Sequence, residues 1–225
     1  MSEFDLSNDS VRALNQSLHQ SETEGQSLSV AKPGGKHNVA VGAKVEYDVN
    51  IHGHVGYYCA GMNQKAHIVV HGNAGPGLAE NMMSGSVRVK GNASQYCGAT
   101  AHGGLLVIEG DAAARCGISM KGVDIVVGGS IGHMSAFMAQ TGRLVICGDA
   151  GEALGDSIYE ARIYLRGKAR SLGTDCIEKP MEDSHREELA ELLKSAGLDH
   201  SVDEFKRYGS ARRLYNFEID NVSAY

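Results

Sequence analysis

The sequence predicts a parallel β-helix, a column of stacked and nearly identical coils, and three observations lead to this fold class. Seven glycines recur with a strict 19-residue period, without an insertion or a deletion. Aliphatic residues precede each glycine at two fixed positions, and polar or small residues follow it at three others. A fixed period of this length is typical of a solenoid, in which stacked repeats bury one continuous core. We call these residues the marker glycines: Gly53, Gly72, Gly91, Gly110, Gly129, Gly148 and Gly167.

Each repeat is expected to contain a short strand that ends at its marker glycine. The residues four and two positions before the glycine are all aliphatic and mostly β-branched, a spacing that indicates a strand with one buried face. The position between them varies from Asn50 to Tyr164, as an outward or interface-facing position does. We expect several such strands in each repeat and a positive φ at the glycine corner. The aliphatic pairs are Val49 and Ile51, Ile68 and Val70, Val87 and Val89, Leu106 and Ile108, Ile125 and Val127, Leu144 and Ile146, and Ile163 and Leu165.

Three further columns follow the marker glycines. A polar column stands directly after them, and its residues are typical of turns. A second inward column is mostly alanine, and a third, seven residues past the glycine, is always small, as the inside of a tight corner requires. The polar column is His54, Asn73, Asn92, Asp111, Ser130, Asp149 and Lys168. The inward column is Val55, Ala74, Ala93, Ala112, Ile131, Ala150 and Ala169. The small column is Ala60, Ala79, Gly98, Gly117, Ala136, Gly155 and Thr174.

The segments outside the repeats are expected to cover the two ends of the column. In residues 1–38 we expect a short helix within 4–25, capped by Asn8 or Asp9, with a stripe of apolar residues. Residues 26–38 are rich in Gly, Ser and Pro and read as a linker. The stripe is Val11, Leu14 and Leu18. The β-helix itself is expected to span 39–180.

Residues 181–225 change to a helical rhythm. A capping box of Ser184 with Glu187 predicts the start of a helix that Gly197 closes. A second short helix is expected at 201–208, where Ser201 and Glu204 repeat the box. The tail from 210 to 225 is expected to pack on its own domain or to dock on a partner. The inward residues are Leu189, Leu192, Leu193 and Ala196 of the first helix and Phe205 and Tyr208 of the second.

Composition excludes several classes of protein. The chain has 225 residues and a formal net charge of −6 without a basic block, which argues against nucleic-acid binding. No apolar run approaches the ~20 residues that span a bilayer. The start of the chain lacks the pattern of a signal peptide, so a cytoplasmic location is expected. The five cysteines form no CxxC pair, which indicates buried, reduced thiols in place of a metal site.

Residues able to carry catalysis are few. His52 and His71 share a column and His54 is near, but a zinc or copper site needs three or four convergent ligands. Asp111 and Asp149 share the polar column, and paired carboxylates of this kind occur in carbohydrate-active β-helix enzymes. Short polar side chains that bond to corner backbone explain this pair more simply. We therefore expect no catalytic, cofactor-binding or metal-binding residue in this chain.

A regular column without a convergent site is typical of a scaffold, whose function lies in its surfaces. Apolar and aromatic residues at the predicted turns and in the tail are the candidates for contact with partners. These candidates are Tyr57, Tyr58, Met82, Met83, Phe137, Met138, Arg212, Arg213, Tyr215 and Phe217.

The repeats resemble a known family. The segments GHVGYYCAGM (53–62), GNASQYCGAT (91–100) and GHMSAFMAQTG (132–142) are similar to the GXGXG domain, the right-handed parallel β-helix at the C-terminus of the large subunit of glutamate synthase. The resemblance covers roughly residues 39–180 and implies a right-handed coil. With SLGTDCIEK (171–179) and RRLYNF (212–217), the chain most resembles the stand-alone GXGXG subunits of N-methylglutamate synthases.

This resemblance implies a non-catalytic subunit of a heteromeric enzyme that converts methylamine and glutamate to N-methylglutamate and ammonia. An amidotransferase-like subunit and an FMN-binding, iron–sulfur subunit would carry catalysis, and this chain, without a cofactor of its own, would bridge them. The domain is also similar to a scaffold subunit of formylmethanofuran dehydrogenase and of the formyltransferase/hydrolase complex, which implies the same role in a different assembly. A carbohydrate-active β-helix enzyme is the third alternative.

Overall fold

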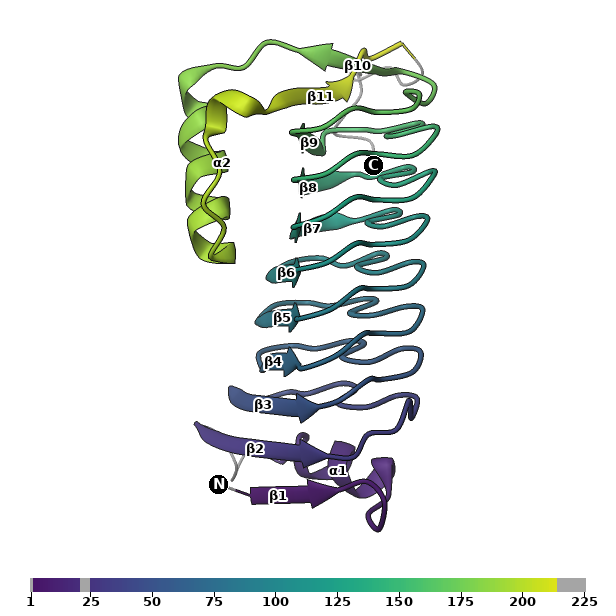
Figure 1. The fold of residues 1–225 in the computed structure, drawn as a ribbon, viewed down its shortest axis with the longest axis vertical. Helices are drawn as coiled ribbons and strands as arrows, with labels where there is room; N and C mark the ends of the chain where they lie inside the picture. The colour runs from purple at the N-terminus through teal and green to yellow at the C-terminus, as the bar shows by residue number, and fades with distance from the viewer. Residues whose placement is uncertain (1, 21–24, 214–225) are drawn as a thin grey trace, which may run out of the picture.

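The computed structural model describes residues 2–20 and 25–213, which form one tall column of stacked coils (Figure 1). A single 11-stranded sheet runs along the column in the order β1-β2-β3-β4-β5-β6-β7-β8-β9-β11-β10. The parallel β-helix with 19-residue coils is therefore confirmed. The strands are β1 (Ser2–Asp5), β2 (Gln26–Ala31), β3 (Tyr47–His52), β4 (His67–Val70), β5 (Ser86–Val89), β6 (Leu105–Ile108), β7 (Lys121–Val127), β8 (Thr141–Ile146), β9 (Arg162–Leu165), β10 (Cys176–Lys179) and β11 (Lys206–Ser210).

The strands stack in register, so that equivalent residues of successive rungs pair directly. Val49 pairs with Ile68, and Ile68 pairs with Val87, in a parallel ladder from β3 to β9. The aliphatic positions four and two residues before each marker glycine are at most 1% exposed. They fill the inside of the column with the interlocking packing of a protein core.

Each rung contains one strand and not the several that we expected. Outside the named strands, the pairing of the described coils is reduced to single-residue bridges, most of them along the column that begins with Val55 and Ala74. The reason is backbone conformation: Tyr58, Ala60 and Met62 have φ of 61°, 56° and 54°. The same three positions, five, seven and nine residues after the marker glycine, are left-handed in the first six rungs. Left-handed residues at every second position do not form an extended strand, and they explain the small column at the corner.

The marker glycines are needed for a reason that we did not expect. Only Gly53 has a positive φ, so the prediction of left-handed corners is wrong for the other six. Instead, backbones of successive rungs approach closely: a Cβ on Gly72 would lie 2.6 Å from the carbonyl carbon of Gly53. On Gly110 it would lie 2.1 Å from Oδ1 of Asn92.

The polar column explains this close approach. The side chain of each polar residue accepts a hydrogen bond from the backbone N–H of the polar residue one rung above, at 2.7–3.0 Å. This polar ladder runs unbroken from His54 to Lys168. A methyl group on the marker glycine would occupy the space that the accepting atom needs.

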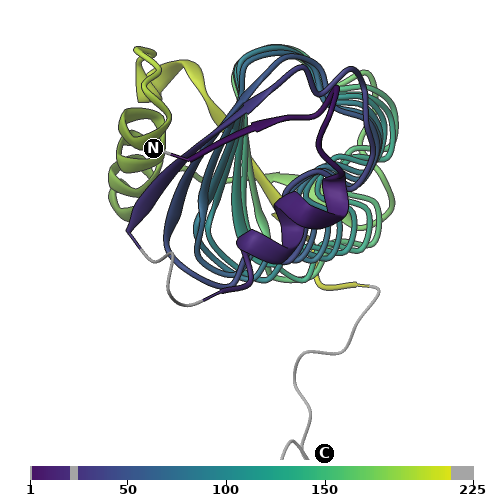
Figure 2. The ribbon, with the colours of Figure 1, turned by 90° about the horizontal axis from the view of Figure 1, so that it is seen from below.

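The lower end of the column is closed by α1 (Val11–Ser17), as Figure 2 shows from below. Leu14 and Leu18 are fully buried against the core of the column, and Asn15 accepts from Val41 N–H and donates to Asn38 C=O. The expected helix is present, but Ser10 caps it in place of Asn8 or Asp9. Part of the expected linker is also wrong, because 26–31 forms β2 and pairs with β3.

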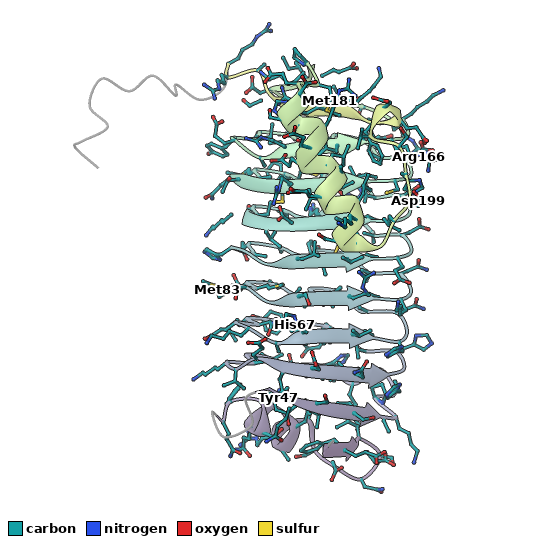
Figure 3. All side chains as sticks on the ribbon, turned by 90° about the vertical axis from the view of Figure 1, so that its left-hand side faces the viewer. Tyr47, His67, Met83, Arg166, Met181 and Asp199 are labelled. Carbon is teal, nitrogen blue, oxygen red and sulfur yellow. The ribbon has the colours of Figure 1, made fainter. Side chains whose placement is uncertain are left out.

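The upper half of the column carries α2 (Asp183–Ala196) on the outside of its strands (Figures 1 and 3). The helix buries its four predicted apolar residues, and Gly197 closes it with a φ of 69°. Its N-cap is Glu182, whose N–H donates to Nδ1 of His185, and not the predicted box of Ser184 with Glu187.

The expected second helix is a single 3₁₀ turn at Val202–Glu204 followed by β11. Phe205 and Tyr208 are buried as predicted. β11 pairs antiparallel with both β9 and β10 and so covers the upper edge of the parallel sheet. An uncovered edge invites pairing with other chains, which explains why the chain continues here as a strand.

Candidate partner surfaces

The outer face of the strands is divided between a covered and an uncovered part. Under α2 the outward position at the middle of each strand is aliphatic or aromatic: Val107, Val126, Val145 and Tyr164 are at most 2% exposed. Below α2 the same position is occupied by Asn50, Val69 and Arg88. No described helix lies over β3 and β4 (Figure 3), and Arg88 of β5 reaches the end of α2. We call the outward residues of β3, β4 and β5, with the residues that directly follow β4 and β5, the uncovered strand face: Asp48, Asn50, His52, His67, Val69, His71, Ser86, Arg88 and Lys90.

Arg88 stands at the boundary between the two parts. Its guanidinium donates to the backbone carbonyls of Ala196 and Ser195 at 3.0 and 3.4 Å, and it pairs with Glu109 at 3.1 Å. The last carbonyls of a helix lack partners within the helix and carry partial negative charge, so a cation stabilises them. Arg88 therefore fixes the point at which α2 ends on the column.

The two stacked histidines belong to the uncovered strand face. The rings of His52 and His71 lie 4.9 Å apart at 14°, and Nε2 of His71 is 3.1 Å from Oδ1 of Asn50. Desolvation, followed by His52 and Lys90, lowers the pKa of His71, which favours the neutral ring. His54 does not join them, because its Nδ1 accepts from Asn73 N–H in the polar ladder. Within residues 2–20 and 25–213, no three potential ligands gather to hold a metal ion.

The two acids that suggested carbohydrate chemistry are part of the same ladder. Asp111 accepts from Ser130 N–H at 2.7 Å, and Asp149 accepts from Lys168 N–H at 2.7 Å. Each carboxylate bonds to the corner of the rung above it, and the two lie two rungs apart. They are not arranged as the opposed acid and base that glycoside hydrolysis requires.

Six of the predicted contact residues lie in the segments that connect the strands of successive coils, and their exposure differs. We call the exposed residues of these segments the turn side. Tyr57, Met83 and Met138 are 48%, 48% and 37% exposed. Met82 is fully buried, so its expected exposure is wrong. Tyr58 and Phe137 are half-buried.

Two features of this side were not apparent from the sequence. Tyr57 stacks on His37 with ring centroids 4.1 Å apart. Met62 is 45% exposed and was missed, although it occupies the same rung position as Met138. The backbone N–H of Met83 bonds to Asn63 C=O, so Met62 and Met83 lie on adjoining rungs. Met138 lies three rungs above Met83, roughly 14 Å along the axis at the strand spacing of a sheet.

The described part of the tail is tied to the column. Arg212 pairs with Glu160 at 3.0 Å, and the backbone N–H of Arg213 donates to Oδ1 of Asp175 at 2.9 Å. Tyr215 and Phe217 lie outside the described residues. The expectation that the tail packs on its own domain therefore holds for its first part.

Comparison with known proteins identifies the family. The chain is 60% identical over 225 residues, 99% of each chain, to Protein GlxC of Rhizobium meliloti (strain 1021). The chain belongs to the GlxC family. No family model and no solved structure matches it. The alignment extends along nearly the full length of both proteins, and so it includes the segments that form the two ends of the column here as well as the coils.

The cysteines of this GlxC-family chain are buried and free of disulfides. Burial raises the pKa of Cys59 to about 12 and that of Cys147 to about 11. A hydrogen bond from the Cys116 thiol to Cys97, together with burial, also raises the pKa of Cys116. Because the thiolate is the reactive form, these cysteines act as packing residues and not as nucleophiles.

None of the helices described in this GlxC-family chain has the length and apolar character needed to cross a membrane.

Proposed function

We propose that the chain is a non-catalytic structural subunit of a glutamate-synthase-like enzyme of the N-methylglutamate synthase type. The observation that carries the proposal is that the polar groups of the chain bond to each other within the fold. The polar ladder bonds the coils to each other. Glu188 of α2 pairs with Arg143 and Arg162 of the strands, so charged groups also join that helix to the column. A chain of this kind offers surfaces and rigidity to an assembly, and the chemistry lies in the partners.

The name and full-length identity of the GlxC relative support this proposal, as does the resemblance of the coils to the GXGXG domain. Its partners would be an amidotransferase-like subunit and an FMN-binding subunit with iron–sulfur clusters. The assembly would form N-methylglutamate and ammonia from methylamine and glutamate in the cytoplasm. This chain would bind no cofactor itself.

Two separate surfaces suit the bridging of two partners. The turn side presents the exposed side chains of Met62, Met83 and Tyr57, and aromatic and methionine side chains are enriched in interfaces. The uncovered strand face presents imidazoles and Lys90 next to the end of α2. The two surfaces differ in chemistry, so each can select a different partner.

The test is purification of the tagged chain from its native cell, followed by mass spectrometry and the absorption spectrum of what is retained. A yellow complex that contains a flavin subunit and an amidotransferase-like subunit, with N-methylglutamate synthase activity, is expected. A zinc-containing complex without flavin would instead indicate the formyl-transferring assembly. Recovery of the chain alone and colourless at every ionic strength would contradict the proposal.

Variants locate the contact. Met62→Asp and Met83→Asp, combined, place two charges on the turn side and are expected to release one partner selectively. Glu191→Lys, on the exposed side of α2, is the matched control and is expected to retain both partners. Equal retention of both partners by the methionine variant would exclude this part of the turn side as an interface.

A further inference from the structure

A pocket of about 310 Å³ lies between the last coils, the start of α2 and β11. Its charged lining consists of Arg162, Lys179, Arg207 and Arg212 together with Glu160. Four cationic side chains and one carboxylate give the pocket a net formal charge of three positive. The chain as a whole has a net charge of −6, so positive charge is concentrated here against the overall balance.

Two of these four cationic side chains pair with a carboxylate, and the described residues provide no such partner for the other two. Arg162 pairs with Glu188 at 2.5 Å, and Arg212 pairs with Glu160 at 3.0 Å. Among residues 2–20 and 25–213, no carboxylate pairs with Lys179 or Arg207. These two residues stand directly opposite each other in the β10–β11 ladder.

Like charges at directly opposed positions of an antiparallel pair are destabilising. The same two strands avoid this on their other face, where Lys206 pairs with Glu178 at 3.0 Å. The pair of Lys179 and Arg207 is therefore a cost that the fold itself does not explain. An anion held between the two side chains would remove the repulsion and add charge-assisted hydrogen bonds.

The neighbouring backbone holds the guanidinium of Arg207 in an orientation that suits such an anion. Its Nε donates to Pro180 C=O at 2.9 Å, which fixes the plane of the guanidinium and leaves both terminal nitrogens as donors. Two donors in one plane match the two oxygens of a carboxylate or phosphate group. Gly209 of the same strand also lines the pocket, and a Cβ there would meet nothing closer than 3.8 Å, so the pocket is open at this point.

His185 forms part of the wall. Its Nδ1 accepts from Glu182 N–H at 3.2 Å, so the proton of the neutral ring is on Nε2. Desolvation, followed by Arg207 and Arg162, lowers the pKa of this histidine. The neutral ring has a donor and requires no counter-charge from a ligand.

We propose that this pocket binds a small oxyanion, a molecule whose carboxylate or phosphate group bridges Lys179 and Arg207. The volume is near the lower end of small-molecule sites, which suits a metabolite with one or two acidic groups. This site is separate from the turn side and from the uncovered strand face, although Arg212, one of the predicted contact residues, forms part of its lining. The proposal does not depend on the proposed function.

The test measures binding of inorganic phosphate and of succinate to the full chain by thermal unfolding and calorimetry, at an ionic strength kept constant with sodium chloride. A ligand that binds only the folded chain raises Tm with concentration, so a saturable increase with at least one of the two is expected. A response to phosphate alone identifies a phosphate site, and a response to succinate alone identifies a carboxylate site. The absence of a response to both would overturn the proposal.

Variants separate the pocket from general charge effects. Arg207→Gln and Lys179→Gln are expected to weaken binding at least tenfold, whereas Lys206→Gln, on the opposite face of β11, is the matched control and keeps it. Gly209→Val places an apolar side chain in the open part of the pocket, where its Cβ meets nothing closer than 3.8 Å, and is expected to abolish binding in a chain that still folds. Lys179→Gln is also expected to unfold, without anion, at a temperature no lower than the native chain. Equal loss of binding in Lys206→Gln, or unchanged binding in Gly209→Val, would contradict the site.

Discussion

Replacement of a marker glycine by alanine tests the close approach of the coils most directly. In Gly110→Ala the new Cβ would lie 2.1 Å from Oδ1 of Asn92 and 2.9 Å from the carbonyl oxygen of Gly91. The methyl must push the Asn92 amide away, which breaks its 2.8 Å hydrogen bond from Asp111 N–H. Overpacking of this kind costs about 1–3 kcal/mol, and the lost bond about 1 kcal/mol. We expect a total of roughly 2–4 kcal/mol.

Thermal unfolding is the suitable assay. For a chain of this size each kcal/mol lowers Tm by about 2–4 °C, so the expected decrease is roughly 4–16 °C. Gly209→Ala is the control, because its Cβ meets nothing closer than 3.8 Å, and it is expected to leave Tm nearly unchanged.

A double variant identifies the cause of the loss. Asn92→Ala alone removes one hydrogen bond and is expected to cost about 1 kcal/mol. Combined with Gly110→Ala it should cost less than the sum, because the atom that the methyl meets is already absent. Strict additivity of the two changes would refute the steric explanation, as would a Gly110→Ala protein as stable as the native chain.

Three other changes are predicted from the packing and the charges. Val127→Asp places an unpaired charge in the fully buried stack of β7 and is expected to yield no soluble folded protein, whereas a soluble variant with a native circular dichroism spectrum would show that the register is wrong. Glu188→Ala removes the carboxylate that pairs with Arg162 and accepts from the Tyr164 hydroxyl. It should loosen the attachment of α2 and lower the free energy of unfolding by about 2–3 kcal/mol. Proteolysis around 197–201 should become faster, and unchanged cleavage would count against this role. The pKa of Asp5 is lowered from 3.8 to about 2, chiefly by its hydrogen bond with Lys32. The contribution of Asp5 to the stability of the fold is therefore complete above about pH 4 and lost as the pH falls towards 2. In acid titrations, Asp5→Asn should lose less stability than the native chain across that window.

The repeat made most of the fold predictable from the sequence. Because equivalent residues pair directly between rungs, the 19-residue period also determines the register of the sheet and the residues that fill its core. The switch from Arg88 to Val107 at the middle of the strands marks where α2 lies, but we made no prediction from it. The period does not indicate why the marker glycines are needed, because that reason depends on a side chain in the preceding rung.

The errors in the assignment of strands and helices occur where the period is interrupted, and the error at Met82 lies within a repeat. In β2, Leu28 pairs with Val49, whereas a strict 19-residue period would align it with Tyr47, so the first full coil was not recognised and was interpreted as a linker. Residues 201–208 were expected to form a helix, whereas Lys206–Ser210 forms β11. No local pattern in the sequence shows that β9 needs a neighbouring strand at the edge of the sheet. Met82 and Met83 are adjacent but face opposite directions, so a shared label as contact residues was correct for only one of them.

The oxyanion pocket had no signal in the sequence at all. Lys179 and Arg207 are far apart along the chain and belong to no motif. Only the antiparallel pairing of β10 with β11 places them opposite each other. Sites of this kind, formed by segments outside a repeat, depend on tertiary structure that the repeat does not encode.

The contact between Arg88 and the end of α2 divides the column into two lengths with different freedom to evolve. From β6 upward every coil lies under the helix, so adding or deleting one would displace the helix from the residues it covers. Below Arg88 a complete 19-residue coil can be inserted or removed without affecting either cap. Each such event would change the span between the two ends by about 4.8 Å. Family members that differ in height are therefore expected to differ in this lower segment.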